Sequence, residues 1–351
     1  MGLIMQIVPL AMLAAGEQEF VDYAAVAHKD DWLRHPVYGD PSFDAFERAP
    51  GNPILRGAPP LEWPVNGFLF EDPVSGHWFV YVGLYAAGYA MGEDKKMICT
   101  VYRSKDRGGS WEPLGPIFPD EPFCFTDLPS PVTYAPDVSV VYDGRKYHLV
   151  YDFATAASTW ATAMEPSGAA DNGIGYAWSG RPEGPFNRTP EPVYRTGAHP
   201  YYRGKYHRAY AQTLIRRAND WLVLAMMDSG PHFSWAMVGM TAERPEGPYS
   251  EPVFLRTVDD EYFHPPLLEF YPAFTYEGYV YAPATSVARN RNFQAVFRAK
   301  IEDVMKSEAW EPFQCGSVWH AADVPNEYYG IWGQTFSGFV DGDKILHAMF
   351  P

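Results

Sequence analysis

Two carboxyl groups stand in the sequence where acid–base chemistry could be carried out. Asp137 immediately precedes the alternating run VSVVY, and Glu269 lies inside the apolar and aromatic stretch PPLLEFYPAF. Burial raises the pKa of a carboxyl group, so an acid in the setting of Glu269 would stay protonated and could donate a proton. A turn or cap aspartate and a hydrogen-bonded structural glutamate are the competing interpretations. Because the two residues are far apart in the chain, only a fold that returns repeatedly to one place can bring them together.

A repeated hairpin pattern predicts such a fold. Five stretches consist of an apolar run, a tight polar turn and an aromatic-rich run, which is the pattern of a β-hairpin. A second hairpin follows each of the first four, and the string RPEGP occurs at both 181–185 and 244–248. Four strands per unit, repeated along the chain, are typical of a β-propeller. The first turn of each unit falls at Gly76, Gly144, Asp220, Gly278 and Gly342.

We therefore predict an all-β fold, a five-bladed β-propeller over residues 45–351. For residues 1–44 we predict a short N-terminal helical segment and lead-in, through which two copies of the chain could form a homodimer. The apolar run in this segment is shorter than the 18 residues of a membrane-spanning helix, so no membrane span is expected. The fifth unit has only two strands before Pro351. Either the segment 52–56 closes the ring or a longer chain does so.

Composition limits the classes of function. Hydrophobic residues make up 47% of the chain and charged residues 20%, as in a folded globular protein. The formal net charge of −16 argues against binding to nucleic acid. Three widely spaced cysteines give neither a disulfide framework nor a zinc spacing. No motif requires a cofactor, a structural divalent cation in the channel is compatible with the sequence, and both a cytoplasmic and a periplasmic or secreted location stay open.

The string SKDRGGSW at 104–111 resembles the Asp box, S-x-D-x-G-x-x-W, of sialidases and some other propellers. In those proteins the motif lies in the turn between the third and fourth strands of a blade. The resemblance implies that Asp106 accepts main-chain N–H groups in the turn and that Trp111 packs between blades. We therefore predict that Asp106 is structural and not catalytic.

The loops on the opposite side of the ring are rich in Tyr, Trp, His and Arg, as in 199–208, 261–270 and 326–334. Such loops suit an uncharged carbohydrate, which stacks on aromatic rings and forms many hydrogen bonds. Arg289 and Arg291 could also pair with a uronate or a sulfate. Aromatic side chains that merely cover loop backbone are the competing interpretation. The predicted substrate-binding residues are Trp63, Asn66, His207, Arg208, His264, Tyr271, Arg289, Trp332 and Gln334.

Three segments resemble the five-bladed glycoside hydrolases of families 43, 32, 117 and 130: EWPVNGFLFEDPVSGHWFVYVG, YAPDVSVVYDGRKYHLVYD and EFYPAFTYEGYVYA. The resemblance spans about residues 45–350. It implies an O-glycosyl hydrolase, and we expect exo action on a plant or algal oligosaccharide or polysaccharide fragment. Two carboxyl groups normally flank the bond that such an enzyme cleaves. In this comparison Glu269 is the general acid, and Asp137 orients that acid, sets its pKa or acts as a base.

The resemblance breaks at one position. Families 43 and 32 place an aspartate at the start of the first inner strand, where this chain has Asn66, which cannot act as a base or nucleophile. We expect Glu62 to supply the missing carboxylate. Family 117 uses a histidine as the acid, which brings His207 and His264 into consideration. Other carboxylates that could serve are Asp40, Asp127, Asp152 and Asp228.

Two further functions stay open on the sequence. Asn66 in place of aspartate favours a non-catalytic carbohydrate-binding propeller. A glycoside phosphorylase similar to family 130 would need a basic cluster for phosphate beside the acid, and Arg208, Arg289 and Arg291 are the available residues.

Overall fold

The computed structural model of the chain describes residues 61–86, 97–118, 122–128, 131–134, 137–155, 172–195, 209–228, 235–256, 268–270, 272–288, 291–316 and 337–349. The helical segment predicted for residues 1–44 lies outside these ranges and gains no support. Within them the regular structure is all β, apart from one short 3-10 turn, η4 (Ser307–Ala309). No helix in the described part has the length and apolar character needed to cross a membrane.

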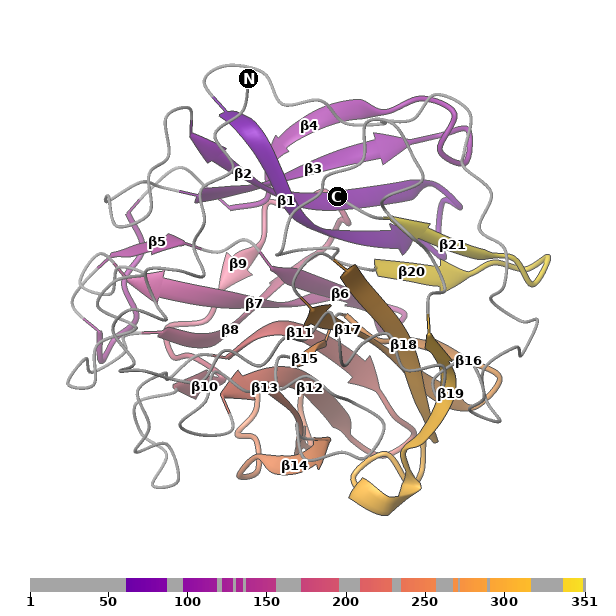
Figure 1. Cartoon of the computed structure of the whole chain (residues 1–351). Coiled ribbons are helices and arrows are strands. Elements are labelled where there is room, and N and C mark those ends of the chain that lie inside the picture. The colour runs from indigo at the N-terminus through magenta and orange to yellow at the C-terminus, as the bar shows by residue number, and fades with distance from the viewer. Residues whose placement is uncertain are drawn as a thin grey trace.

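The described residues form four propeller blades, each an antiparallel sheet (Figure 1). In blades 1 and 3, four consecutive strands pair in chain order. Blade 1 consists of β1 (Leu61–Glu71), β2 (Trp78–Ala86), β3 (Met97–Ser104) and β4 (Glu112–Pro116). Blade 3 consists of β11 (Ala209–Arg216), β12 (Trp221–Asp228), β13 (Trp235–Ala242) and β14 (Val253–Arg256).

Blades 2 and 4 have an inner strand that is divided in two, with both pieces paired to the next strand. Blade 2 consists of β5 (Val132–Tyr134), β6 (Val138–Tyr142), β7 (Tyr147–Thr155), β8 (Asn172–Ser179), β9 (Asn187–Arg188) and β10 (Tyr194–Arg195). Blade 4 consists of β15 (Leu268–Phe270), β16 (Phe274–Tyr276), β17 (Tyr279–Ala288), β18 (Arg291–Lys300) and β19 (Glu311–Gly316).

The prediction of five blades is wrong, because the described residues form four. The fifth unit is a two-stranded sheet of β20 (Ser337–Val340) and β21 (Leu346–Met349). β20 contacts β1 of blade 1 and β16 of blade 4, so the hairpin lies between the first and the last blade. Two strands are all that this unit supplies among the described residues. They link blade 4 to blade 1 without forming a blade of their own.

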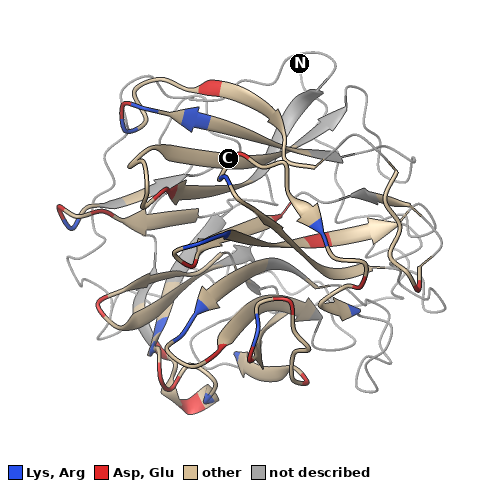
Figure 2. Ribbon diagram, turned by 180° about the vertical axis from the view of Figure 1, so that it is seen from behind, with Lys and Arg blue, Asp and Glu red and all other residues tan. Residues whose placement is uncertain are grey.

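The predicted hairpin turns are confirmed. Gly76, Gly144 and Gly278 have φ angles of 69°, 98° and 80°, in the left-handed region where glycine is favoured. In the last hairpin the left-handed residue is Lys344, with φ 66°, and not Gly342. Figure 2 shows that most of the strand ribbon is uncharged and that many of the acidic and basic residues lie in the turns, as expected for turns in water.

The core consists of layers between adjacent blades. Along β7, Leu149 and Tyr151 belong to a cluster with residues of blade 1, whereas Val150 belongs to one with residues of blade 3. Both faces of this strand are therefore buried, and every residue from Tyr147 to Thr155 is buried. A third cluster joins Leu222 and Leu224 of blade 3 to Val280 of blade 4.

Buried hydroxyl groups fix the inner strands relative to one another. Ser139 Oγ accepts the N–H of Leu214 at 3.1 Å, Thr213 Oγ1 accepts that of Ala273 at 2.7 Å, and Ser337 Oγ accepts that of Leu69 at 2.8 Å. Each hydroxyl residue lies three positions before the last residue of its own inner strand. The inner strands therefore run in the same direction, and equivalent positions of neighbouring strands lie at the same height. We call the end at which they begin the mouth, and the opposite end the turn end.

Candidate functional site

The inner strands depart from regular pairing near the mouth. In blade 1 the register between β1 and β2 shifts between Val65 and Gly67, which leaves Asn66 as the extra residue. In blade 3 the register between β11 and β12 shifts between Tyr210 and Thr213. In blades 2 and 4 the inner strand is interrupted altogether. Such irregularities bend a strand and re-aim its side chains, and they are frequent beside active sites.

Asp137 lies at the interruption in blade 2, directly before β6, and is 8% exposed. Its main-chain N–H donates to Oδ1 of Asp152 at 2.8 Å, and the N–H of Asp152 donates to the Asp137 carbonyl oxygen at 3.1 Å. The same carbonyl oxygen accepts Nε2 of Gln212 at 2.5 Å, from the inner strand of blade 3. The predicted site residue is thus held by two neighbouring strands from two blades.

The charges of this pair of carboxylates also act on a buried thiol of blade 1. Burial raises the pKa of the Cys99 thiol well above its usual value, and the negative charges of Asp137 and Asp152 raise it further. Cys99 is 4% exposed and lies on β3 of blade 1. This thiol is therefore protonated and carries no charge. Hydrogen bonds join Asp137, Asp152 and Gln212 across two blades, and we call these three residues the mouth cluster.

Of the four carboxylates considered as substitutes for Asn66, Asp152 joins Asp137 in the mouth cluster. Asp127 does not, because its exposed carboxylate forms an ion pair with Arg195 of β10 at 3.0 Å. Asp228 is the last residue of β12, where it pairs with Trp235. Asp40 lies outside the described residues.

The main chain places Glu269 at the mouth end of blade 4. It is the middle residue of β15 and pairs with Thr285 of β17. The next residue, Phe270, is 2% exposed and packs in the cluster between blades 3 and 4, with its N–H directed at Met226 Sδ at 3.3 Å. The main chain next to Glu269 therefore borders the apolar interface between blades 3 and 4, and the burial and role of Glu269 itself stay predictions.

The first strand carries Glu62, Trp63 and Asn66, whose main-chain positions are described. Asn66 lies five positions before the end of β1, as Asp137 does before the end of β6, so the two residues occupy equivalent places in their blades. Glu62 falls at a second register shift, between Leu61 and Trp63. This equivalence concerns the main chain, and the roles of Glu62, Trp63 and Asn66 stay predictions.

The remaining site residues of the sequence analysis stay predictions. In blade 4, Arg291 pairs with Ala288 at the start of β18. No group of three or more His, Cys, Asp or Glu in the described ranges is arranged to hold a metal ion, and a divalent cation in the channel stays untested. The site residues outside the described ranges are His207, Arg208, His264, Tyr271, Arg289, Trp332 and Gln334.

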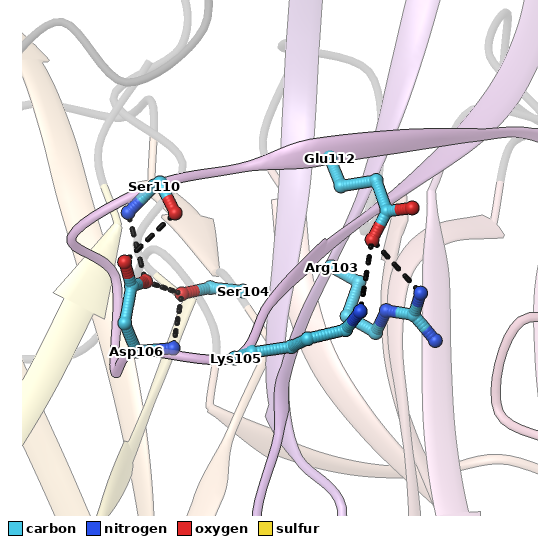
Figure 3. Close-up of polar contacts among 6 residues, drawn as sticks. All are labelled: Arg103, Ser104, Lys105, Asp106, Ser110 and Glu112. Carbon is cyan, nitrogen blue, oxygen red and sulfur yellow. Dashed lines mark hydrogen bonds and ion pairs between the residues drawn. The ribbon is translucent and has the colours of Figure 1, made fainter.

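Asp106 has a structural role at the other end of the ring (Figure 3). Its Oδ1 accepts Ser104 Oγ at 2.7 Å and the Ser110 N–H at 2.8 Å, and its Oδ2 accepts Ser110 Oγ at 2.7 Å. These hydrogen bonds, led by that of Ser104, lower the pKa of Asp106 to about 2. The residue lies in the turn between β3 and β4, which is at the turn end, and Trp111 packs against Leu69 and Val80.

A buried histidine provides a second arrangement of ionisable groups. His148 Nδ1 lies 2.6 Å from the hydroxyl of Tyr176, and its Nε2 lies 3.1 Å from Asp143 Oδ2. Burial lowers the pKa of His148 although Asp143 opposes the shift. Asp143 also accepts the N–H groups of Arg145 and Lys146, so it is the turn residue of the blade 2 hairpin. This group stabilises the turn end and is separate from the mouth cluster.

The mouth cluster contains one residue that the sequence analysis missed, Gln212. A glutamine inside the run AQTLIRR carries no signal of its own. Its position two residues before the apolar run LI could have placed it near the start of an inner strand. Its contact with Asp137 depends on how two blades are set against each other.

Comparison with known proteins identifies the fold. No family model matches the sequence, and no curated protein is significantly similar to it. An endo-arabinase from Bacteroides thetaiotaomicron VPI-5482 is similar in structure, with a TM-score of 0.53 and 13% identity over 84% of this chain and 91% of that one. Another similar structure comes from family 130, which is described as a family of mannoside phosphorylases that contains glycoside hydrolases targeting β-1,2 mannosidic linkages in Candida mannan. It has a TM-score of 0.59 and 12% identity over 87% of this chain and 90% of that one.

A thermostable family-43 glycoside hydrolase is also similar, with a TM-score of 0.50 and 11% identity over 74% of this chain and 75% of that one. These likenesses establish a propeller fold that is shared with glycoside hydrolases.

Proposed function

We propose that this protein is a glycoside hydrolase that acts on the ends of a plant or algal oligosaccharide or polysaccharide fragment. In this proposal Glu269 donates a proton to the leaving oxygen, and Asp137 orients that acid or serves as the base. The observation that carries the proposal is the burial of Asp137 at the mouth, with its main chain fixed by hydrogen bonds from two blades.

The shared fold supports the proposal at the level of reaction class. The structural neighbours with this propeller include an endo-arabinase and a family-43 glycoside hydrolase. The apolar and aromatic sequence around Glu269, PPLLEFYPAF, favours a protonated carboxyl group, as a general acid requires. Glu62, on the same strand as Asn66, is our candidate for the carboxylate that Asn66 cannot provide.

The proposal is tested with a panel of aryl glycosides and plant and algal oligosaccharides. On a substrate that the parent protein cleaves, Asp137→Asn, Glu269→Gln and Glu62→Gln should each lower kcat by about 10² to 10⁴, the usual contribution of a general acid or base. Asp127→Asn is the matched control, because it neutralises an exposed carboxylate that is outside the mouth cluster. Full turnover in both Asp137→Asn and Glu269→Gln would exclude the assignment.

A non-catalytic carbohydrate-binding propeller is the second candidate, and Asn66 at the place equivalent to Asp137 favours it. Calorimetry that detects sugar binding, together with an absence of cleaved product, would support this function over hydrolysis. The third candidate is a glycoside phosphorylase, since a structural neighbour comes from family 130. Turnover that depends on inorganic phosphate would separate a phosphorylase from a hydrolase.

A further inference from the structure

We propose that Asp152 and Gln212 are positioning residues, which fix the main chain of Asp137 at the mouth. This inference rests on the proposed function of Asp137 for its effect on catalysis. Its structural part, the hydrogen bonding of the Asp137 main chain, stands independently of any reaction.

The pairing of Asp137 with Asp152 departs from a regular β-ladder. In an antiparallel sheet, two residues of a hydrogen-bonded pair exchange two main-chain bonds. Here the N–H of Asp152 donates to the Asp137 carbonyl oxygen at 3.1 Å, as in a regular ladder. The N–H of Asp137, however, donates to the Oδ1 atom of the Asp152 side chain at 2.8 Å. A carboxylate thus takes the place of a main-chain carbonyl between the two strands.

The use of a side-chain carboxylate as the acceptor determines where Asp137 lies. A buried N–H without an acceptor costs about 1–3 kcal/mol. If the Asp152 carboxylate were removed, β6 would either carry that cost or shift to find another acceptor. Asp152 is 5% exposed, so water has little access to replace the carboxylate. Either outcome moves or loosens the residue that is proposed to act on the substrate.

Gln212 fixes the same residue from blade 3. Its side chain is fully buried, and its Nε2 donates to the Asp137 carbonyl oxygen at 2.5 Å. The reversed amide would place two acceptor oxygens against each other, so this contact sets the orientation of the amide. The Asp137 carbonyl oxygen therefore accepts one hydrogen bond from its own blade and one from the next.

The equivalent place in blade 1 lacks this arrangement. The register shift at Asn66 lies opposite Val82 and Gly83 of β2, neither of which has a carboxylate. A propeller blade of this chain can therefore form its irregular mouth end without an acidic side chain in the neighbouring strand. A carboxylate at the place of Asp152 is thus present in blade 2 and absent from the equivalent place in blade 1.

The test compares two substitutions at Asp152. Asp152→Asn keeps an Oδ1 acceptor without the charge, and Asp152→Ala removes the acceptor. For a positioning residue, Asp152→Ala should lower kcat by roughly 100-fold with KM nearly unchanged, the loss expected from a displacement of about 1 Å. Asp152→Asn should restore most of kcat. Equal losses in the two variants would show that the charge of Asp152 matters and would overturn the proposal.

Substitutions at Gln212 provide the independent arm. Gln212→Met removes the donor and keeps a similar shape, and it should lower kcat in the same way as Asp152→Ala. The matched control is Ser139→Ala, which removes a buried hydrogen bond between the same two blades without touching Asp137. That variant should unfold at a lower urea concentration and keep its kcat. A kcat in Gln212→Met equal to that of Ser139→Ala would overturn the role of Gln212.

Amide hydrogen exchange of the Asp137 N–H separates the structural claim from the proposed function. The amide should be protected in the parent and in Asp152→Asn and should exchange faster in Asp152→Ala. Unchanged exchange in Asp152→Ala would overturn the claim. If the parent cleaves none of the glycosides, the proposed function fails, while the exchange result still decides whether Asp152 holds Asp137.

Discussion

The hydroxyl of Tyr147 donates a hydrogen bond to Oδ1 of Asp72 at 2.7 Å and so connects the start of β7 to the hairpin turn of blade 1. Burial alone would raise the pKa of Asp72, but hydrogen bonds from Ser75, Tyr147 and main-chain N–H groups outweigh it, and the pKa is lowered. Asp72 is therefore an ionised, buried residue that holds its own turn and the neighbouring blade at once.

Replacement of Tyr147 by phenylalanine should lower the free energy of unfolding by about 1.5–3 kcal/mol, the usual contribution of a hydrogen bond to a charged group. Urea unfolding measures this effect. Tyr102→Phe, at a half-buried tyrosine of β3, is the control for loss of a hydroxyl group that leaves Asp72 untouched. Equal midpoints for Tyr147→Phe and the parent would show that the bond contributes nothing to stability.

The hydroxyl groups that join the inner strands should be individually important. Ser337→Ala leaves the buried N–H of Leu69 without its acceptor at the junction of the β20–β21 hairpin and blade 1. We expect a loss of about 1–3 kcal/mol in the free energy of unfolding, the cost of an unsatisfied buried donor. Thr213→Val, which acts between blades 3 and 4, should have an effect of similar size. A variant that unfolds at the parent's urea concentration would refute the importance of that link.

Local signals in the sequence were enough to find the hairpins and the role of Asp106. Gly76 and Gly144 mark turns because glycine adopts positive φ without strain, and the Asp box carries its hydrogen-bonding partners within eight consecutive residues. The contact between Gln212 and Asp137 could not be predicted in this way, because the two residues come from different blades. Its existence depends on the rotation of one blade against the next.

The number of blades was also beyond local signals. The last hairpin, β20–β21, has the same pattern as the first hairpin of every blade, so the sequence presented it as a fifth blade. This hairpin differs from the others because, among the described residues, no further strand pairs with its outer edge. Whether a hairpin is completed into a blade depends on the segments that pair with its outer edge.

The pKa of Asp106 predicts how acid acts on the turn end. Its folded pKa of about 2 lies below the ordinary value of 3.8, so the ionised carboxylate favours the folded state above about pH 4. This contribution is lost as the pH falls toward 2. Asp106→Asn should therefore be less stable than the parent at neutral pH, and the difference should shrink below pH 4.

The same variant should keep the parent's turnover on any substrate, because the Asp box lies at the turn end and not at the mouth. Thermal unfolding between pH 2 and 7, combined with an activity assay at pH 7, measures both effects. A loss of turnover without a loss of stability would contradict the structural role of Asp106.

The buried His148 predicts a second pH dependence, at a higher pH. Burial lowers its folded pKa below the ordinary value of 6.5, so the unfolded chain takes up a proton before the folded one does. The free energy of unfolding should be unaffected by this group above about pH 6.5 and should fall as the pH drops below it. His148→Gln removes the titrating ring, so the slope of stability between pH 7 and 5 should be smaller in the variant than in the parent. Urea unfolding at several pH values measures this slope. An equal slope of the free energy of unfolding against pH in the two proteins would mean that another group governs stability in this range.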